Sequence, residues 1–350
     1  MLSENVDLLA EARNHLSRMR VAEALRCFDA AESAGYDPDV CAAGRWTCHM
    51  LTGDYEEAWR ESDAIEARGR PDPHRFWDGQ SFAGRNVLLR CLHGLGDTIQ
   101  FIRYAPLIRA QARTLTIEAQ PKLKRLLEAA KIADRVITWG EAEPPWDQQV
   151  EVNELPRIFR TTLRSIPNDV PSLRLGEQTP VAKHAGSQPL RVGLAWAASD
   201  FNRARTVPVE LLTPLFDIPG TQFFSVQAGP EYAQLQPWAN QVKSLTEEST
   251  CILQVAHEMN NLHLIITVDT MTAHLAGALG RQTWTLLPFA CDWRWMLDRS
   301  DTPWYPTMRL FRQTTPGNWK PVIQEVQQEL MRLLPAQNVL KAKRFNGRFD

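Results

Sequence analysis

The stretch at residues 264–280, LIITVDTMTAHLAGALG, constrains the fold of this 350-residue chain more than any other. It begins with LIITV, a short run rich in β-branched residues, which is typical of a strand buried on both faces. Asp269 and Thr270 follow as a capping position, residues 271–279 have helical composition, and a glycine stands where the helix would end. The stretch therefore predicts a strand that leads directly into a helix.

A junction of this kind is suited to binding phosphate. The first turn of a helix presents free backbone N–H groups and the positive end of the helix dipole. Thr270, Thr272 and His274 lie in that turn, where they can donate hydrogen bonds to phosphate oxygens. With Asp269 they are candidate binding residues. The alternative is an ordinary strand, cap and core helix, which many α/β proteins contain.

The composition excludes several classes of protein. A formal net charge of -2 and a pI near 6.5 give no general attraction to nucleic acid or acidic membranes. The six cysteines form no CxxC pair, which favours reduced thiols over disulfides or a zinc site. The N-terminus is acidic where a signal peptide is apolar, and no run approaches the ~20 apolar residues of a membrane span. We expect a cytoplasmic protein with no metal, nucleic-acid partner or transmembrane segment.

Residues 1–75 contain no convincing strand, and apolar residues recur there at helical spacing. Two segments resemble each other, MRVAEALRCFDAAESAG and GDYEEAWRESDAIEARG, and their equivalent residues Ala24 and Ala58 are 34 positions apart (58 − 24), the tetratricopeptide period. About two such repeats are too few to stand alone, so we expect them to pack on the next domain. Their acidic surface could dock a protein partner or a second copy; the alternative is a helical cap with a solvated face.

Strands and helices alternate over residues 84–180, which predicts a parallel sheet with helical crossovers. The run NVLLRCL indicates a buried strand from Asn86 to Leu92, followed by the loop HGLGD. A helix is expected to open at Thr98 and to kink at Pro106. Further strands are expected in TLTIEAQ, DRVITWG and QQVEVNELP, with a helix in PKLKRLLEAA.

The loop HGLGD is the candidate site of this first unit. Gly94 and Gly96 allow the backbone to turn sharply and to approach a ligand closely. Asp97 follows them at the carboxyl edge of the sheet, where α/β proteins bind ligands. Asp97 has two interpretations, a helix N-cap or a general base aimed at an acceptor hydroxyl.

A second α/β unit is predicted over residues 188–316, after a linker rich in Pro, Gly and polar residues at 167–187. Its first strand, LRVGLAW, leads into the loop AASDFNRARTVP. Ser199, Arg203 and Arg205 in this loop suit a diphosphate, because cationic side chains directly follow a strand. The alternative is a solvated surface loop.

The rest of the second unit is expected to continue the alternation. Strands are predicted in TQFFSVQAG, VKSL and QTWTLLPF, the last strong strand, and helices at about 231–240 and in ILQVAHEMNN. Tryptophans gather after residue 283, where they could stack on a sugar or base, or pack the domain edge. Residues 335–350 form a basic tail, which could touch phosphate or an acidic partner but which we expect to be frayed.

Two successive α/β units with polar loops after their first strands place both loops on one interdomain cleft. In this setting the segments HGLGDTIQFIRYAPLI, RVGLAWAASDFNRART, ITVDTMTAHLAGALG and LLPFACDWRWMLDRSDTPWYPTMRLFRQ resemble glycosyltransferase family 9, the heptosyltransferase-like enzymes. The resemblance covers roughly residues 84–333, and it points to the bacterial members with N-terminal tetratricopeptide repeats.

The resemblance implies a GT-B fold. The helical segment would be followed by two Rossmann-like domains. The first would bind the acceptor and the second the nucleotide sugar, and a last helix at 317–334 would cross back towards the first domain. It also implies an inverting, metal-independent transfer to a saccharide or protein hydroxyl. The donor, a nucleoside-diphosphate sugar, is a substrate, so no cofactor is expected.

The resemblance also suggests individual roles. Asp97 matches the family's base, which deprotonates the acceptor hydroxyl. Arg203 and Arg205 correspond by region only to a basic phosphate contact. The residues that match the donor-binding element are Asp269, Thr270 and His274.

Two other functions stay open. The chain could be a non-catalytic scaffold in a polysaccharide or protein-glycosylation pathway, but a scaffold has no chemical need for Asp97, Asp269 and His274. It could also be a sugar-nucleotide epimerase of the same fold, which would need further carboxylates in the cleft. The nucleotide base, the sugar, the acceptor and the oligomeric state stay open.

Overall fold

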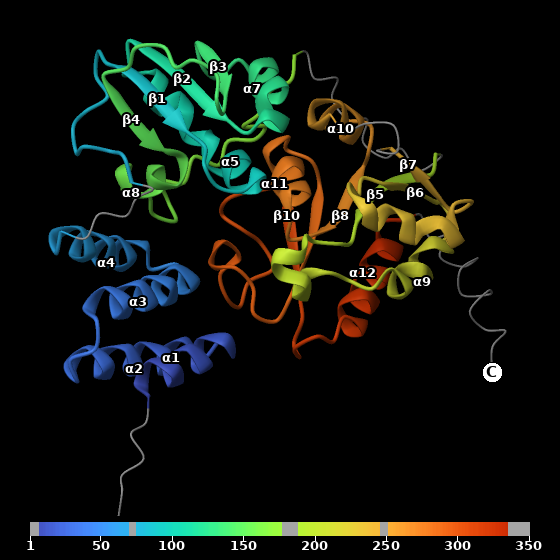
Figure 1. Ribbon diagram of the computed structural model, residues 1–350. Coiled ribbons are helices and arrows are strands. Elements are labelled where there is room, and N and C mark those ends of the chain that lie inside the picture. The colour runs from blue at the N-terminus through green and yellow to red at the C-terminus, as the bar shows by residue number, and fades with distance from the viewer. Residues whose placement is uncertain (1–6, 70–74, 177–187, 246–250, 335–350) are drawn as a thin grey trace, which may run out of the picture.

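The structure is a computed structural model, which describes residues 7–69, 75–176, 188–245 and 251–334 (Figure 1). It comprises a group of N-terminal helices and two α/β domains, each built on a parallel sheet. The basic tail at 335–350 and the linker residues 177–187 lie outside the described residues. In the described part, no helix combines the length and the apolar character needed to cross a membrane.

The described N-terminal segment consists of helices, each of which packs against the next along the chain (Figure 1). They are α1 (Leu8–Ser17), α2 (Val21–Ser33), α3 (Pro38–Thr52) and α4 (Tyr55–Ala67). Ala24 and Ala58 are fully buried, as expected of small residues where helices approach closely. The indole of Trp59 donates a hydrogen bond to the carbonyl of Thr161 (2.7 Å). The expectation that these helices pack on the following domain is therefore confirmed.

The first domain has a parallel sheet with the strand order β3-β2-β1-β4 in the described residues. Its strands are β1 (Asn86–Arg90), β2 (Thr114–Ala119), β3 (Arg135–Thr138) and β4 (Gln148–Glu151). Its helices are α5 (Leu95–Phe101), α6 (Ala105–Arg109), α7 (Lys124–Ala130) and α8 (Leu155–Ile158). Residues 87–89 of β1 are buried in the middle of the sheet, so the loop after β1 opens at the centre of its carboxyl edge.

The second domain has the strand order β10-β9-β8-β5-β6-β7, again all parallel. The strands are β5 (Leu190–Ala195), β6 (Thr221–Ser225), β7 (Val242–Ser244), β8 (Leu264–Val268), β9 (Thr283–Leu287) and β10 (Met308–Arg312). The helices are α9 (Thr213–Phe216), α10 (Ile252–Met259), α11 (Met271–Ala278) and α12 (Lys320–Arg332). Counted from its own first strand, this is the Rossmann order. The prediction of two parallel sheets with helical crossovers is confirmed.

Two expectations about the first domain are wrong. The helix expected to open at Thr98 begins three residues earlier, because the Asp97 carboxylate accepts a hydrogen bond from the backbone N–H of Gly94 and closes the first turn (3.0 Å). After α5 the chain passes through a 3₁₀ turn at Ile102–Tyr104 into α6. Pro106 lies in the first turn of α6, where its missing N–H costs nothing, and so it does not kink a longer helix.

Three expectations about the second domain also need correction. The helix expected at about 231–240 is a run of 3₁₀ turns at Pro230–Trp238, which includes Pro237. A further strand, β10 (Met308–Arg312), follows the last strand expected from the sequence. Helix α12 was expected to cross back, but its buried side chains belong to the core of the second domain. They are Val322, Ile323, Val326 and Leu330.

The two domains meet through α5 and α11, which pack against each other (Figure 1). A Cβ on Gly96 would lie 2.8 Å from Cδ2 of His274, so only glycine allows this approach. One hydrophobic cluster includes buried residues of the N-terminal helices and of both α/β domains. This continuous core holds the segments that follow β1 and β8 close to each other.

Candidate functional site

A cleft of about 950 Å³ lies between the two α/β domains. Its walls are the segments that follow β1 and β2 in the first sheet and β5, β6, β8 and β9 in the second. Parallel sheets place the carboxyl ends of their strands along one edge, so side chains far apart in the sequence converge there. The two loops expected to face one cleft, HGLGD and AASDFNRARTVP, both contribute to it.

Nearly all the candidate residues line this cleft. Arg203 does not: it is exposed and absent from the lining, although Arg205 two positions later is part of it. Both residues lie in the 3₁₀ segment at Asp200–Arg205, where successive residues are about 120° apart, so the two side chains leave on different sides. The candidates that line the cleft are Gly94, Gly96, Asp97, Ser199, Arg205, Asp269, Thr270, Thr272 and His274.

Asp97 faces the cleft from the first turn of α5. It is the third residue of the helix, so the interpretation of Asp97 as the N-cap residue is wrong; Gly94 holds that position. Oδ2 accepts the hydrogen bond from the Gly94 N–H, and Oδ1 accepts one from the guanidinium of Arg294. The side chain keeps 28% of its surface exposed, so the carboxylate is fixed in direction and still reachable from the cleft.

Arg294 is a cleft residue that the sequence analysis does not single out. Its guanidinium pairs with Asp97 and with Asp292 (2.9 Å), and it lies over the rings of Trp293 (4.8 Å) and Phe101 (5.4 Å). Burial lowers its pKa, but the two carboxylates more than compensate, so the pKa is raised and the group stays charged. The alternating acidic, aromatic and basic residues of CDWRWM are the signal that could have identified it.

The buried end of the cleft is formed by His274 and Asp269. The His274 ring stacks on Trp295 (5.5 Å), and its Nδ1 shares a hydrogen bond with the hydroxyl of Tyr305 (3.0 Å). Burial, with nearby arginines, lowers the pKa of His274 well below 6.5, so the ring is neutral at pH 7. A neutral imidazole in this place can act as a hydrogen-bond partner but carries no positive charge.

Asp269 positions a cation. Burial raises the pKa of its carboxyl to about 6, and Asp292 adds to the rise, whereas Arg205 opposes it. Its Oδ2 lies 3.7 Å from Nη1 of Arg205. Asp269 does not cap α11: the N-cap residue is Thr270, whose hydroxyl donates instead to the Val268 carbonyl (3.4 Å). No side-chain cap therefore occupies the N–H groups of the first turn of α11.

The tryptophans at residues 293–304 divide into two groups. Trp295 and Trp304 are fully buried and pack the junction of the domains, which agrees with the domain-packing interpretation. Trp293 is half-buried and contributes to a second, smaller cavity. One of these rings is thus placed to contact a ligand.

The cleft combines groups suited to a diphosphate with one suited to a hydroxyl. Arg205, Arg294 and Lys122 bring positive charge to its walls. The first turn of α11 adds backbone N–H groups at the positive end of a helix dipole. Asp97 supplies a carboxylate on the opposite wall. Cations and N–H groups that already point at one place can compensate the charge of a departing diphosphate.

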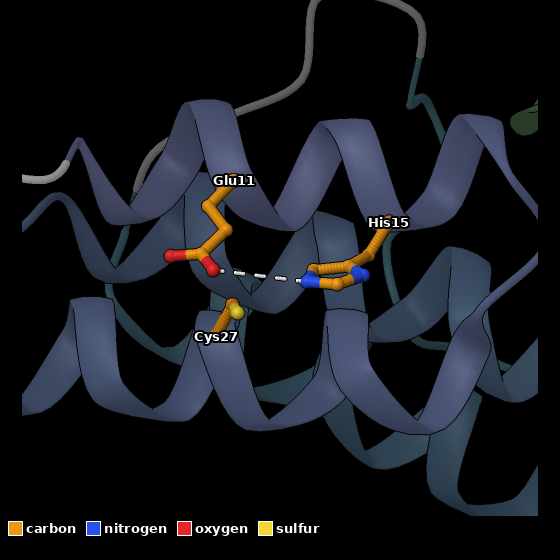
Figure 2. Close-up of side chains that lie close together, drawn as sticks. All are labelled: Glu11, His15 and Cys27. Atoms are coloured by element: carbon orange, nitrogen blue, oxygen red, sulfur yellow. Dashed lines mark ion pairs between the residues drawn. The ribbon is translucent and has the colours of Figure 1, made fainter.

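A different group of side chains could hold a metal ion, and it lies in the N-terminal helices. Figure 2 shows Glu11 and His15 one turn apart on α1, with Cys27 of the neighbouring α2 beside them. Their ligand atoms lie within 4.8 Å of one another, and Nε2 of His15 is 3.8 Å from Oε1 of Glu11. None of the three lines the cleft, so they take no direct part in its chemistry.

No family model matches the chain. Among curated proteins, Protein FlbA from Caulobacter vibrioides is 26% identical over an alignment 363 positions long, which covers 91% of this chain and 59% of FlbA. The chain therefore spans 59% of the length of this relative.

Several solved structures resemble the chain in part. The glycosyltransferase family 9 structure from Veillonella parvula has a TM-score of 0.49 and 14% identity, covering 75% of this chain and 99% of that one. The ADP-heptose lps heptosyltransferase II of E. coli has a TM-score of 0.46 and 14% identity, covering 71% and 98%. The iron-containing dodecameric glycosyltransferase TibC of enterotoxigenic E. coli has a TM-score of 0.46 and 15% identity, covering 77% and 78%.

Proposed function

We propose that this chain is a glycosyltransferase of the GT-B fold, which moves a sugar from a nucleoside-diphosphate sugar to a hydroxyl of a saccharide or a protein. One observation carries the proposal. Asp97 of the first domain shares a cleft of about 950 Å³ with Arg205, Arg294 and the uncapped first turn of α11 in the second. That volume is within the range of small-molecule sites, roughly 300 to 1,000 Å³.

The proposed reaction is a single displacement with inversion. Asp97 takes the proton of the acceptor hydroxyl, and the oxygen attacks the anomeric carbon of the donor. The bond between that carbon and the diphosphate breaks, and the nucleoside diphosphate leaves with the bonding electron pair. Arg205, Arg294 and the N–H groups of α11 compensate its charge, so the step as proposed needs no metal or cofactor.

The other site residues have supporting roles in this proposal. Gly94 and Gly96 let the loop after β1 lie close to the second domain, and Gly96 in particular contacts His274. Ser199, Thr270 and Thr272 line the donor wall with hydroxyls, which can donate to phosphate oxygens. Arg203, outside the cleft, has no role in it.

The N-terminal helices are proposed to be tetratricopeptide-like and to bind a protein partner or a second copy of the chain. A cytoplasmic location fits a donor of this class. The proposal for the helices rests on the repeat and the acidic surface in the sequence, and the proposal of a cytoplasmic location rests on the sequence alone.

The alternative is a non-catalytic scaffold, and one contact favours it. Both oxygens of Asp97 already accept a hydrogen bond, Oδ1 from Arg294 and Oδ2 from Gly94, so contacts within the protein account for this carboxylate without an acceptor hydroxyl. In a scaffold the Asp97–Arg294 pair would serve only to join the two domains.

Two measurements decide between these functions. In a thermal-shift panel of ADP, GDP, UDP, CMP and dTDP, one nucleotide should selectively raise the melting temperature. At 100 times its dissociation constant, that nucleotide should stabilise the protein by about 2.7 kcal/mol. Transfer with the matching donor should then be lost in Asp97→Asn, while nucleotide binding persists. Undiminished transfer by that variant removes Asp97 as the base, and no shift by any nucleotide favours the scaffold.

A further inference from the structure

A second cavity of about 280 Å³ lies where all three parts of the molecule meet. Trp46 of α3 and Trp59 of α4 form its wall on the side of the N-terminal helices. Phe101 of the first domain and Trp293 of the second provide two more aromatic rings. Four aromatic rings therefore line the cavity beside charged and polar side chains, and helices outside the two α/β domains contribute two of these rings.

We propose that this cavity is the acceptor site, that it receives one sugar ring of a saccharide acceptor, and that α3 and α4 thereby select the acceptor. The proposal rests on the proposed glycosyl transfer, and it assigns to the N-terminal helices a direct contact with the substrate.

The cavity adjoins the point of transfer. His93 and Arg294 line both the smaller cavity and the large cleft, so a ligand in one lies against a wall of the other. Arg294 is also paired with Asp97, the proposed base. An acceptor hydroxyl that reaches past Arg294 from the smaller cavity would meet the Asp97 carboxylate, whose oxygens each accept one hydrogen bond and can accept another.

The polar groups of the cavity suit hydroxyls. Glu151 is buried at the end of β4, where it accepts backbone N–H bonds from Asn153 (2.6 Å) and Leu92 (3.3 Å). Each carboxylate oxygen can accept a further bond. The side-chain Oδ1 of Asn153 is buried and has no hydrogen-bond partner among the described residues. A buried acceptor without a partner is costly, and a ligand hydroxyl would satisfy it.

The shape of the cavity favours a single ring over a polypeptide segment. Known modes of peptide recognition use a sheet edge or an elongated groove that follows an extended or helical chain. This cavity holds only about 280 Å³ and is lined by rings from α3, α4, α5 and the turn at Trp293–Trp295. Aromatic faces can cover the C–H faces of a sugar ring while carboxylate and amide groups bind its hydroxyls.

The test is ligand binding to the full chain, measured by saturation-transfer NMR. The probes are methyl glycosides of common hexoses, of an N-acetylhexosamine and of a heptose, with acetylated Ser and Thr tripeptide amides as the polypeptide alternative. At least one glycoside should bind with a millimolar dissociation constant. Trp46→Ala and Asn153→Ala should each weaken that binding about tenfold or more.

The matched control is Trp146→Ala, because Trp146 is exposed and outside the cavity; it should leave glycoside binding unchanged. The nucleotide thermal shift, measured on the same samples, separates the two proposals. If a glycoside binds the wild-type protein but not Trp46→Ala, and no nucleotide gives a thermal shift, the sugar site is supported and the proposed glycosyl transfer fails. A normal nucleotide shift with no glycoside bound, or with binding unaffected by both cavity variants, overturns the acceptor site. Binding of the tripeptides alone overturns the sugar assignment.

Discussion

The guanidinium of Arg294 forms an ion pair with the carboxylate of Asp97, which lies 197 positions earlier in the sequence. This pair joins the segment after β9 of the second domain to the first turn of α5 in the first. It also places a cation beside the proposed base and on the wall of the cleft proposed for the diphosphate. One contact thus connects the domain interface, the acceptor side and the donor side.

Arg294→Gln should weaken nucleoside-diphosphate binding about tenfold, because losing one charge-assisted contact costs roughly 1.5 kcal/mol. Isothermal titration with the nucleotide selected by thermal shift measures this. Arg299→Gln is the matched control, since Arg299 pairs with the exposed Asp301 (2.7 Å) and is outside the cleft lining. Equal affinity in Arg294→Gln and the wild-type protein would contradict a role for Arg294 in donor binding.

Arg205→Ala and Arg203→Ala form a natural pair of variants, because both change one arginine of the same loop. Arg205 lines the cleft beside Asp269, whereas Arg203 is exposed and outside it. We expect Arg205→Ala to lower nucleotide affinity about tenfold and Arg203→Ala to leave it within twofold, from the energy of a charged hydrogen bond. Similar losses of nucleotide affinity in both variants would mean that the loop acts only through its net charge.

Gly96→Ala should destabilise the protein by roughly 1 to 3 kcal/mol, the usual cost of overpacking. The added Cβ would lie 2.8 Å from Cδ2 of His274, which forces α5 away from α11. Denaturant unfolding of the single variants and of the double variant Gly96→Ala/His274→Ala measures the coupling between the two positions. The double variant should be more stable than the sum of the single changes predicts. Strict additivity would show that the two residues do not interact.

Glu151 should make stability depend on pH. Burial raises its pKa from 4.5 to about 7, with backbone N–H donors opposing the rise. The folded state therefore holds the proton more tightly than the unfolded chain, and the stabilisation present below pH 4.5 is lost as pH rises to 7. The shift corresponds to roughly 3 kcal/mol at most. The free energy of unfolding of the wild type relative to Glu151→Gln should fall over this range.

The measurement is denaturant unfolding of both proteins at several pH values between 4 and 8. Glu141→Gln is the control, because Glu141 is exposed and its pKa is lowered, first by its contact with Lys124. The contribution of Glu141 to stability is small and has the opposite pH dependence, because it appears as pH rises. A difference between wild type and Glu151→Gln that is constant with pH would show that Glu151 has no raised pKa.

Several elements could be predicted from the sequence because their causes are local. The run at residues 264–268 forms β8 with all five residues buried, and the glycine after α11, Gly280, has the positive φ of 68° that ends a helix. Buried β-branched runs and helix-ending glycines depend on neighbouring residues alone. Local patterns were misleading at Pro230–Trp238, where the prolines disfavour a continuous α-helix. They also gave little sign of β10, because the alternation of apolar and polar residues over its five positions is weak.

The sequence by itself determined most of the strands and helices and the polar loops after β1 and β5, since periodicity and turn chemistry are encoded within a few residues. Only the tertiary structure decided which side chains meet. It brought Arg294 to Asp97, directed Arg205 but not Arg203 into the cleft, and placed Trp46 of the N-terminal helices beside Trp293 (5.5 Å). Such pairs depend on how two domains pack, and packing is set by the summed burial of many residues, which no local pattern contains.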